Sequence, residues 1–132
     1  GIVPAKAGFL FKAMLFMMLG KWGMKRLNRM IYYNTQVPPE VIEFAAIVMR
    51  NFSPNTTEPL RLFRDEEILN LTMPVLFFGG TKDALIDSVK TGRRLELLLP
   101  QAQVNILADT GHAILGKSEE ILRFLAISCF SS

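Results

Sequence analysis

The sequence has 132 residues, of which half are hydrophobic and a fifth are charged, values typical of one globular domain. Its net charge of +3 is too small to indicate a nucleic-acid-binding protein. A single cysteine excludes a disulfide scaffold, and one cysteine with one histidine leaves too few strong ligands for a zinc site. The longest unbroken apolar run, residues 13–19, is shorter than the roughly 20 residues of a membrane span and lacks a signal-peptide cleavage site. We therefore expect a soluble, cytoplasmic protein that uses no metal or organic cofactor.

The charge is unevenly distributed along the chain. Residues 1–39 contain six basic residues and no acidic one, a charge of +6, whereas residues 40–132 contain nine basic and twelve acidic residues, a charge of −3. Five of the seven methionines also lie in the first thirty residues. The chain therefore consists of two unlike parts. A solvated surface is the preferred interpretation of the basic part, and contact with an anionic membrane surface is the alternative.

The basic part is expected to be helical. Residues 9–19 contain almost no polar residue besides Lys12, which predicts a helix that is buried or covers an apolar surface. Residues 24–33 alternate basic and apolar residues at helical spacing, and Pro38-Pro39-Glu40 predicts the start of a third helix. The turn-forming sequence NFSPNTTEP at residues 51–59 marks the expected boundary between the two parts.

The pattern after this boundary predicts strands. Residues 75–78 form an unbroken apolar run that ends at Gly79-Gly80, and residues 104–108 form a similar run. Short apolar runs without alternation are typical of strands buried on both faces of a parallel sheet. Helical spacing from Val89 to Leu98 connects the two runs, which predicts a right-handed βαβ unit and the α/β class.

Two further helices complete the expected fold. A short one opens at Asp65, where three acidic residues follow one another, and the last one opens at Ser118. In the last helix we expect Ile121, Leu122 and Leu125 to face the sheet.

Asp83 and His112 follow the two expected strands, five residues after Phe78 and four residues after Ala108 respectively. The carboxyl ends of parallel strands meet at one edge of a sheet, about 4.8 Å apart, so these side chains can come within hydrogen-bonding distance. A carboxylate that orients an imidazole supplies two members of a nucleophile–base–acid triad. Asp83 and His112 are therefore the candidate catalytic residues.

The segments MPVLFFGGTKDALID (73–87) and VNILADTGHAIL (104–115) resemble the final third of an α/β-hydrolase. In that family the acid follows a late strand in a G-x-x-D setting, and the histidine follows the last strand in a G-H pair. The resemblance implies that Asp83 is the acid and His112 the base. It also implies that residues 1–59 are a helical cap and residues 60–132 the C-terminal part of the hydrolase core. The apolar cap favours a small apolar ester or acyl substrate.

The sequence departs from the family in one respect. It contains no G-x-S-x-G, the motif that carries the family's serine nucleophile and precedes the cap. Two strands also cannot form a complete sheet. We therefore expect a fragment of a larger serine hydrolase of the ester or lipid type, with an incomplete sheet, whose partner is the remainder of its own core. Alone it should be inactive.

Several alternatives stay open. Asp87 is a rival acid in the same loop, although it is better placed to cap the following helix. Asp83 could instead serve only as a turn or helix cap, and His112 as an ordinary surface or core residue. An upstream aspartate nucleophile would make the protein a dehalogenase or epoxide hydrolase. From a different class, a non-catalytic hydrolase-like scaffold or an interfacial binding module would use the basic, Met-rich helices.

Overall fold

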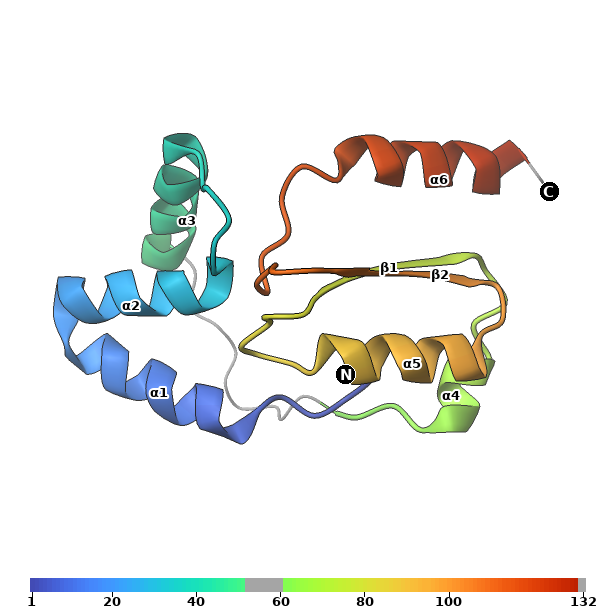
Figure 1. The fold of residues 1–132 in the computed structure, drawn as a ribbon, viewed down its shortest axis with the longest axis horizontal. Coiled ribbons are helices and arrows are strands. Elements are labelled where there is room, and N and C mark those ends of the chain that lie inside the picture. The colour runs from blue at the N-terminus through green and yellow to red at the C-terminus, as the bar shows by residue number, and fades with distance from the viewer. Residues whose placement is uncertain (52–60, 131–132) are drawn as a thin grey trace.

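The computed structural model describes residues 1–51 and 61–130, which form a helical N-terminal part and an α/β C-terminal part (Figure 1). The N-terminal part contains α1 (Ala7–Met18), α2 (Gly20–Tyr32) and α3 (Pro39–Asn51). All three helices lie within or close to the ranges expected from the sequence. Residues 52–59 of the expected boundary turn lie outside the described residues, so the division at residue 59 stays a prediction.

Two glycines allow α1 and α2 to pack closely. Gly20 has φ +58°, a conformation that L side chains rarely adopt, and it begins α2 directly after Leu19. A Cβ atom on Gly23 would overlap the carbonyl oxygen of Phe16 in α1. The rings of Phe16 and Trp22 also meet edge to face, with centroids 6.5 Å apart. The helices therefore fold back on one another through small residues and one aromatic pair.

Of the two expectations for the first helix, burial is not met among the described residues, and its covering an apolar surface stays a prediction. Phe11, Met14, Met17 and Met18 are between 59% and 80% exposed. The physical reason is that α1 is apolar around most of its circumference, whereas a single neighbouring helix covers only one side of it. The α1 apolar face thus remains open in this chain.

The C-terminal part is an α/β unit, which confirms the expected fold class. Its elements are α4 (Asp65–Leu69), β1 (Val75–Gly80), α5 (Ser88–Leu98), β2 (Ala102–Leu107) and α6 (Ser118–Phe130). Among the described residues, β1 and β2 form a two-stranded parallel sheet, with Val75 paired to Ala102 and Gly80 to Leu107. The sheet is not closed, as expected. Because the strands are parallel and pair residue by residue over their whole length, both end at the same edge of the sheet.

The strand boundaries differ from those expected. Gly79 and Gly80 were expected to end the first strand, but they lie within β1, and β2 begins two residues earlier than expected. A Cβ atom on Gly80 would overlap the carbonyl oxygens of Thr110 and Gly111. Glycine therefore serves here to bring the two post-strand loops together, not to stop the strand.

The core lies between α5 and one face of the sheet. Ile68, Leu95 and Leu99 are at most 3% exposed and form its centre. Partly buried residues of both strands, including Phe77 and Val104, pack against them. The two layers thus fix the position of the loops that leave the strands.

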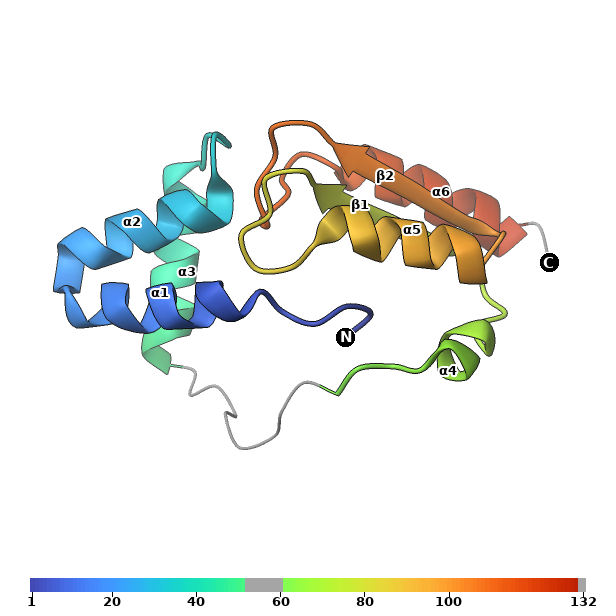
Figure 2. The same ribbon diagram turned by 60° about the horizontal axis from the view of Figure 1, so that its bottom comes forward.

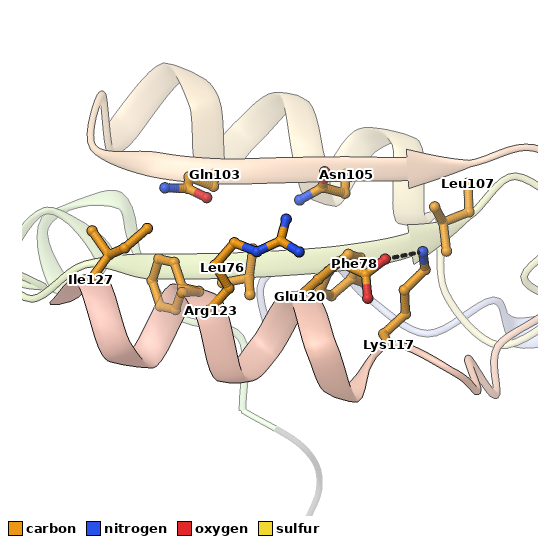
Figure 3. Close-up of a pocket in the computed structure, with 10 residues that line it drawn as sticks. Leu76, Phe78, Gln103, Asn105, Leu107, Lys117, Glu120, Arg123 and Ile127 are labelled. Carbon is orange, nitrogen blue, oxygen red and sulfur yellow. Dashed lines mark hydrogen bonds and ion pairs between the residues drawn. The ribbon is translucent and has the colours of Figure 1, made fainter. Parts of the chain in front are cut away.

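The last helix covers the other face of the sheet (Figure 1), but not with the residues expected. Ile121, Leu122 and Leu125 are 41%, 66% and 50% exposed. A pocket of about 240 Å³ lies between α6 and the strands. Its helix side, drawn in Figure 3, is lined by Lys117 just before α6 and by Glu120, Arg123, Phe124 and Ile127 of the helix. The expectation was wrong because the apolar residues of this helix do not form a single stripe, so sequence spacing alone did not identify the inward face.

The first residues of the chain run along the C-terminal part (Figure 2). The amide of Phe63 donates to the carbonyl of Gly1 over 2.9 Å, and the amide of Lys6 donates to the carbonyl of Leu85 over 2.7 Å. The guanidinium of Arg94 in α5 donates to the carbonyl of Ile2. These bonds attach the segment before α1 to the residues before α4, to α5 and to the loop that follows β1.

Candidate functional site

The loops that follow β1 and β2 are joined by hydrogen bonds at the carboxyl edge of the sheet. The amide of Thr81 donates to the carbonyl of Leu107, and the amide of Lys82 donates to that of Thr110, both over 2.9 Å. The hydroxyl of Thr81 accepts from the amide of Asp109 over 3.0 Å. These contacts hold the two loops, and the side chains between them, in one fixed arrangement.

Asp83 lies in the first loop with its side chain only 4% exposed. Its Oδ1 accepts hydrogen bonds from the amides of Leu85 (2.8 Å) and Ile86 (3.1 Å). Its Oδ2 accepts from the hydroxyl of Ser88 over 2.8 Å and lies 2.9 Å from Nδ1 of His112. The structure therefore brings the two predicted site residues into direct contact.

The surroundings of Asp83 determine its ionisation. Burial raises the pKa of this carboxyl group, but hydrogen bonds from His112, the Ile86 amide, Ser88 and the Leu85 amide together hold the pKa below its ordinary value of 3.8. Asp83 is therefore a carboxylate at neutral pH. An ionised carboxylate only accepts hydrogen bonds, so Nδ1 of His112 carries the hydrogen and Nε2 is the acceptor nitrogen of the neutral ring.

His112 lies at the surface end of this pair, with a side chain that is 39% exposed. Its backbone amide donates to the carbonyl of Ile31 at the end of α2, over 2.8 Å. A Cβ atom on Gly111 would lie 2.5 Å from the same carbonyl oxygen, so glycine is required immediately before the histidine. Tyr33 and Thr110 also form an isolated antiparallel bridge. The N-terminal helices thus help to set the position of His112.

Ser88 is a member of this site that the sequence analysis did not identify. Ser88 is the first residue of α5. Its side chain nevertheless points back to Asp83, and the residue is 3% exposed. The one available signal was its position five residues after Asp83 at a helix start, where hydroxyl side chains frequently bond to nearby acceptors.

The rival acid Asp87 has a different role in the structure. It is the N-cap of α5, and its Oδ1 accepts from the amide of Lys90 over 3.0 Å. Its other oxygen lies 3.7 Å from the ammonium group of the same lysine. This capping role is the one favoured by the sequence.

The local role considered for Asp83 is also present. The two amide bonds to Oδ1 form the turn that the sequence allowed for. In addition, the ammonium group of Lys6 donates to the carbonyl of Asp83 over 2.6 Å. Asp83 thus shapes its loop with one carboxylate oxygen and contacts His112 with the other.

Within residues 1–51 and 61–130, no group of three or more His, Cys, Asp or Glu side chains is arranged to hold a metal ion. No helix in these ranges is long and apolar enough to cross a membrane. The side chains that meet in one hydrogen-bonded group at this edge of the sheet are the Asp83 carboxylate, the His112 imidazole and the Ser88 hydroxyl.

The fold is similar to that of two esterases of known structure. Carboxylesterase CesB (YbfK) from Bacillus subtilis matches 99% of this chain with a TM-score of 0.72 and 19% sequence identity. Naproxen esterase (carboxylesterase NP) from the same organism matches 99% with a TM-score of 0.69 and 20% identity. The chain spans about half of each, 48% and 47% of their lengths. No protein-family model and no curated protein matches the sequence.

These likenesses confirm the fold that the sequence suggested. The chain has the architecture of the C-terminal part of an α/β-hydrolase, with α5 and α6 on opposite faces of the last two strands.

Proposed function

We propose that this chain is the cap and the C-terminal core of an α/β-hydrolase that cleaves esters, with Asp83 as the acid and His112 as the base of its triad. The observation that carries the proposal is the 2.9 Å separation of Asp83 Oδ2 and His112 Nδ1 at the carboxyl edge of two parallel strands. The names of the two structural neighbours support an ester as the substrate class.

The geometry fits the first half of such a reaction. Nε2 of His112 accepts the proton of a serine hydroxyl as the serine oxygen forms a bond to the ester carbonyl carbon. The ring becomes an imidazolium, and the ionised Asp83 stabilises its positive charge through Nδ1. The bond between the carbonyl carbon and the alkoxy oxygen then breaks, and the imidazolium returns its proton to the departing alcohol. The serine is left acylated.

Water completes the cycle by the same route. His112 Nε2 accepts a proton from water as the water oxygen attacks the acyl carbon, and the proton passes to the serine oxygen as the acid leaves. The serine belongs to the part of the protein outside these 132 residues, so the 132 residues alone are expected to be inactive. The apolar side chains of α1 support an apolar acyl group as part of the substrate.

A fluorophosphonate probe, which reacts with an activated serine, tests this proposal in the intact protein. We expect covalent labelling and ester hydrolysis in the wild type, and loss of both in His112→Ala with an unchanged circular dichroism spectrum. Unchanged labelling of His112→Ala would contradict the role of the histidine.

A folded wild type that hydrolyses substrate without labelling would indicate an aspartate nucleophile, as in a dehalogenase or epoxide hydrolase. Incorporation of ¹⁸O from water into that aspartate would then be found.

One observation favours a second candidate function, an interfacial binding module without catalysis. The apolar face of α1 is exposed, and the neighbouring α2 bears exposed basic side chains. Sedimentation of the intact protein with vesicles that contain anionic lipid tests this candidate. Binding that weakens as salt is raised, in a protein that hydrolyses no ester, would favour it.

A further inference from the structure

A cleft of about 400 Å³ lies where α1, α2 and the loop after β1 meet. Four positively charged residues line it: Lys12 of α1, Arg26 and Arg29 of α2, and Lys82 of the loop. Among the residues that line the cleft there is no acidic one. Positively charged side chains from three separate segments of the chain therefore line the same cleft.

The four cations lack carboxylate partners within the described part of the chain, where none of them lies within 4.0 Å of a carboxylate. Other basic residues of the molecule do have such partners, for example Lys117 with Glu120. Bringing like charges together without compensation is unfavourable, and a cleft with apolar walls strengthens their combined field. The arrangement is one that an anion would stabilise.

The rest of the cleft wall is apolar. Phe16, Met30, Tyr33 and Ala84 line it together with the cations. The volume falls in the range of sites for small molecules, which combine apolar walls with a few polar groups that fix orientation. The ligand that fits this chemistry has an apolar body and a negatively charged group.

The cleft is lined by sequence neighbours of the residues that form and position the proposed catalytic pair. Lys82 and Ala84 flank Asp83 in the sequence, and Met30 precedes Ile31, whose carbonyl accepts the hydrogen bond of the His112 amide. The segments that line the cleft are therefore the same ones that position the acid and the base. A ligand in the cleft would therefore contact the two residues that flank Asp83 in the sequence.

We propose that this cleft binds a carboxylate of the substrate, so that the preferred ester is one that carries a second, free acid group. The preference for such an ester rests on the proposed function, whereas the binding of a carboxylate in the cleft does not depend on it. Arginine favours a carboxylate because its planar fork matches the two oxygens. The cations converge on a concave site from the helices and from the core loop, an arrangement that suits a small anion better than a flat membrane surface.

Two esters of matched length test the proposal in the intact protein: ethyl pentanoate, which is neutral, and monoethyl glutarate, in which a carboxylate replaces the terminal methyl group. We expect the wild type to have the higher kcat/KM for monoethyl glutarate. In Arg29→Gln the loss of kcat/KM for monoethyl glutarate should exceed the loss for ethyl pentanoate by roughly tenfold. Lys21→Gln, an exposed lysine on the same helix, is the matched control and should leave the ratio unchanged.

Three outcomes would overturn the proposal. Equal changes for the two esters in Arg29→Gln would show that the charge does not select the substrate. A lower unfolding midpoint with unchanged selectivity would assign the arginine to an ion pair within the protein. Anionic-vesicle binding that is lost in Arg29→Gln, again with unchanged selectivity, would assign the cleft to a membrane surface.

If the intact protein hydrolyses neither ester, the proposed function fails, and the binding proposal is tested separately by calorimetric titration with glutarate. Binding to the wild type that weakens roughly tenfold in Arg29→Gln would support the cleft as a carboxylate site. No detectable binding to the folded wild type would overturn it.

Discussion

The hydroxyl of Ser88 donates a 2.8 Å hydrogen bond to Oδ2 of Asp83, the same oxygen that lies 2.9 Å from Nδ1 of His112. Ser88 is the first residue of α5 and is 3% exposed. The start of a helix anchored in the core therefore holds the carboxylate from one side while the histidine lies on the other. We infer that Ser88 is a positioning residue for the acid.

Substitution Ser88→Ala should remove one of the hydrogen bonds that hold the Asp83 carboxylate. Removal of a hydrogen bond to a charged, buried group costs about 1–3 kcal/mol of stability, and the pKa of Asp83 should rise because one of the bonds that lower it is lost. If the proposed function holds, kcat of the intact protein should fall by roughly tenfold, with the acidic limb of the pH–rate profile moved to higher pH. Ser118→Ala, an exposed helix start, is the control. A profile identical to that of the wild type would contradict the assignment.

Substitution Asp83→Asn should abolish most activity while the fold remains. The amide can donate to Nδ1 and so favours the wrong tautomer of His112, which in triads of this kind lowers kcat by about 10⁴-fold. Asp87→Asn is the matched control, because Asp87 caps α5 and accepts from Lys90; it should change stability by at most about 1 kcal/mol. Steady-state ester hydrolysis distinguishes the two. Comparable losses of kcat in both variants would contradict the assignment of Asp83, rather than Asp87, as the acid.

The pH dependence of stability should report the same carboxylate. The pKa of Asp83 is lower in the folded state than its ordinary value of 3.8, so its stabilisation is complete at pH values above 3.8. It is lost as the pH falls toward the folded pKa, because the unfolded chain binds the proton first. Urea unfolding between pH 7 and pH 3 should therefore show less acid destabilisation in Asp83→Asn than in the wild type. Asp109→Asn, an exposed carboxylate at φ +48°, is the control and should retain the wild-type slope.

The packing of α1 on α2 should depend on Gly23. A Cβ atom there would overlap the carbonyl oxygen of Phe16, so Gly23→Ala should destabilise the protein by about 1–3 kcal/mol. Gly8→Ala is the matched control: it lies in α1 with open space around it, and it should be neutral or stabilising by up to about 1 kcal/mol. Thermal unfolding of both variants measures the difference. A Gly23→Ala variant as stable as Gly8→Ala would show that the helices separate without cost.

Local sequence signals identified most of the secondary structure. The proline pair at residues 38–39 and the acidic start at Asp65 each begin a helix in the structure, because these residues act on the helix end within their own turn. Strand ends were less predictable. Gly79 and Gly80 look like a stop signal, yet they extend β1, since the requirement they meet is the close approach of Thr110 and Gly111 from another segment.

The sequence also did not predict correctly which faces of the helices are buried. Ile121, Leu122 and Leu125 are apolar but exposed, whereas Glu120 and Arg123 line the pocket beside the sheet. The apolar residues of α1 likewise remain exposed. The apolar residues of a helix show that it favours burial, but which neighbouring element covers them is decided only by the tertiary structure.

The length and composition of the sequence, its apolar runs and the spacing of Asp83 and His112 after two strands determined the α/β class and the edge of the sheet at which these residues lie. Only the tertiary structure decided what surrounds them: the hydroxyl of Ser88, the Ile31 carbonyl that holds the His112 backbone, and the cationic cleft between the helices and the loop. The physical reason is that strand and helix signals act over a few neighbouring residues. The contact of His112 with Asp83, the bond from the His112 amide to Ile31 and the charges of the cleft join segments dozens of residues apart, whereas Ser88 lies only five residues from Asp83 and needs the fold of the intervening loop to reach it.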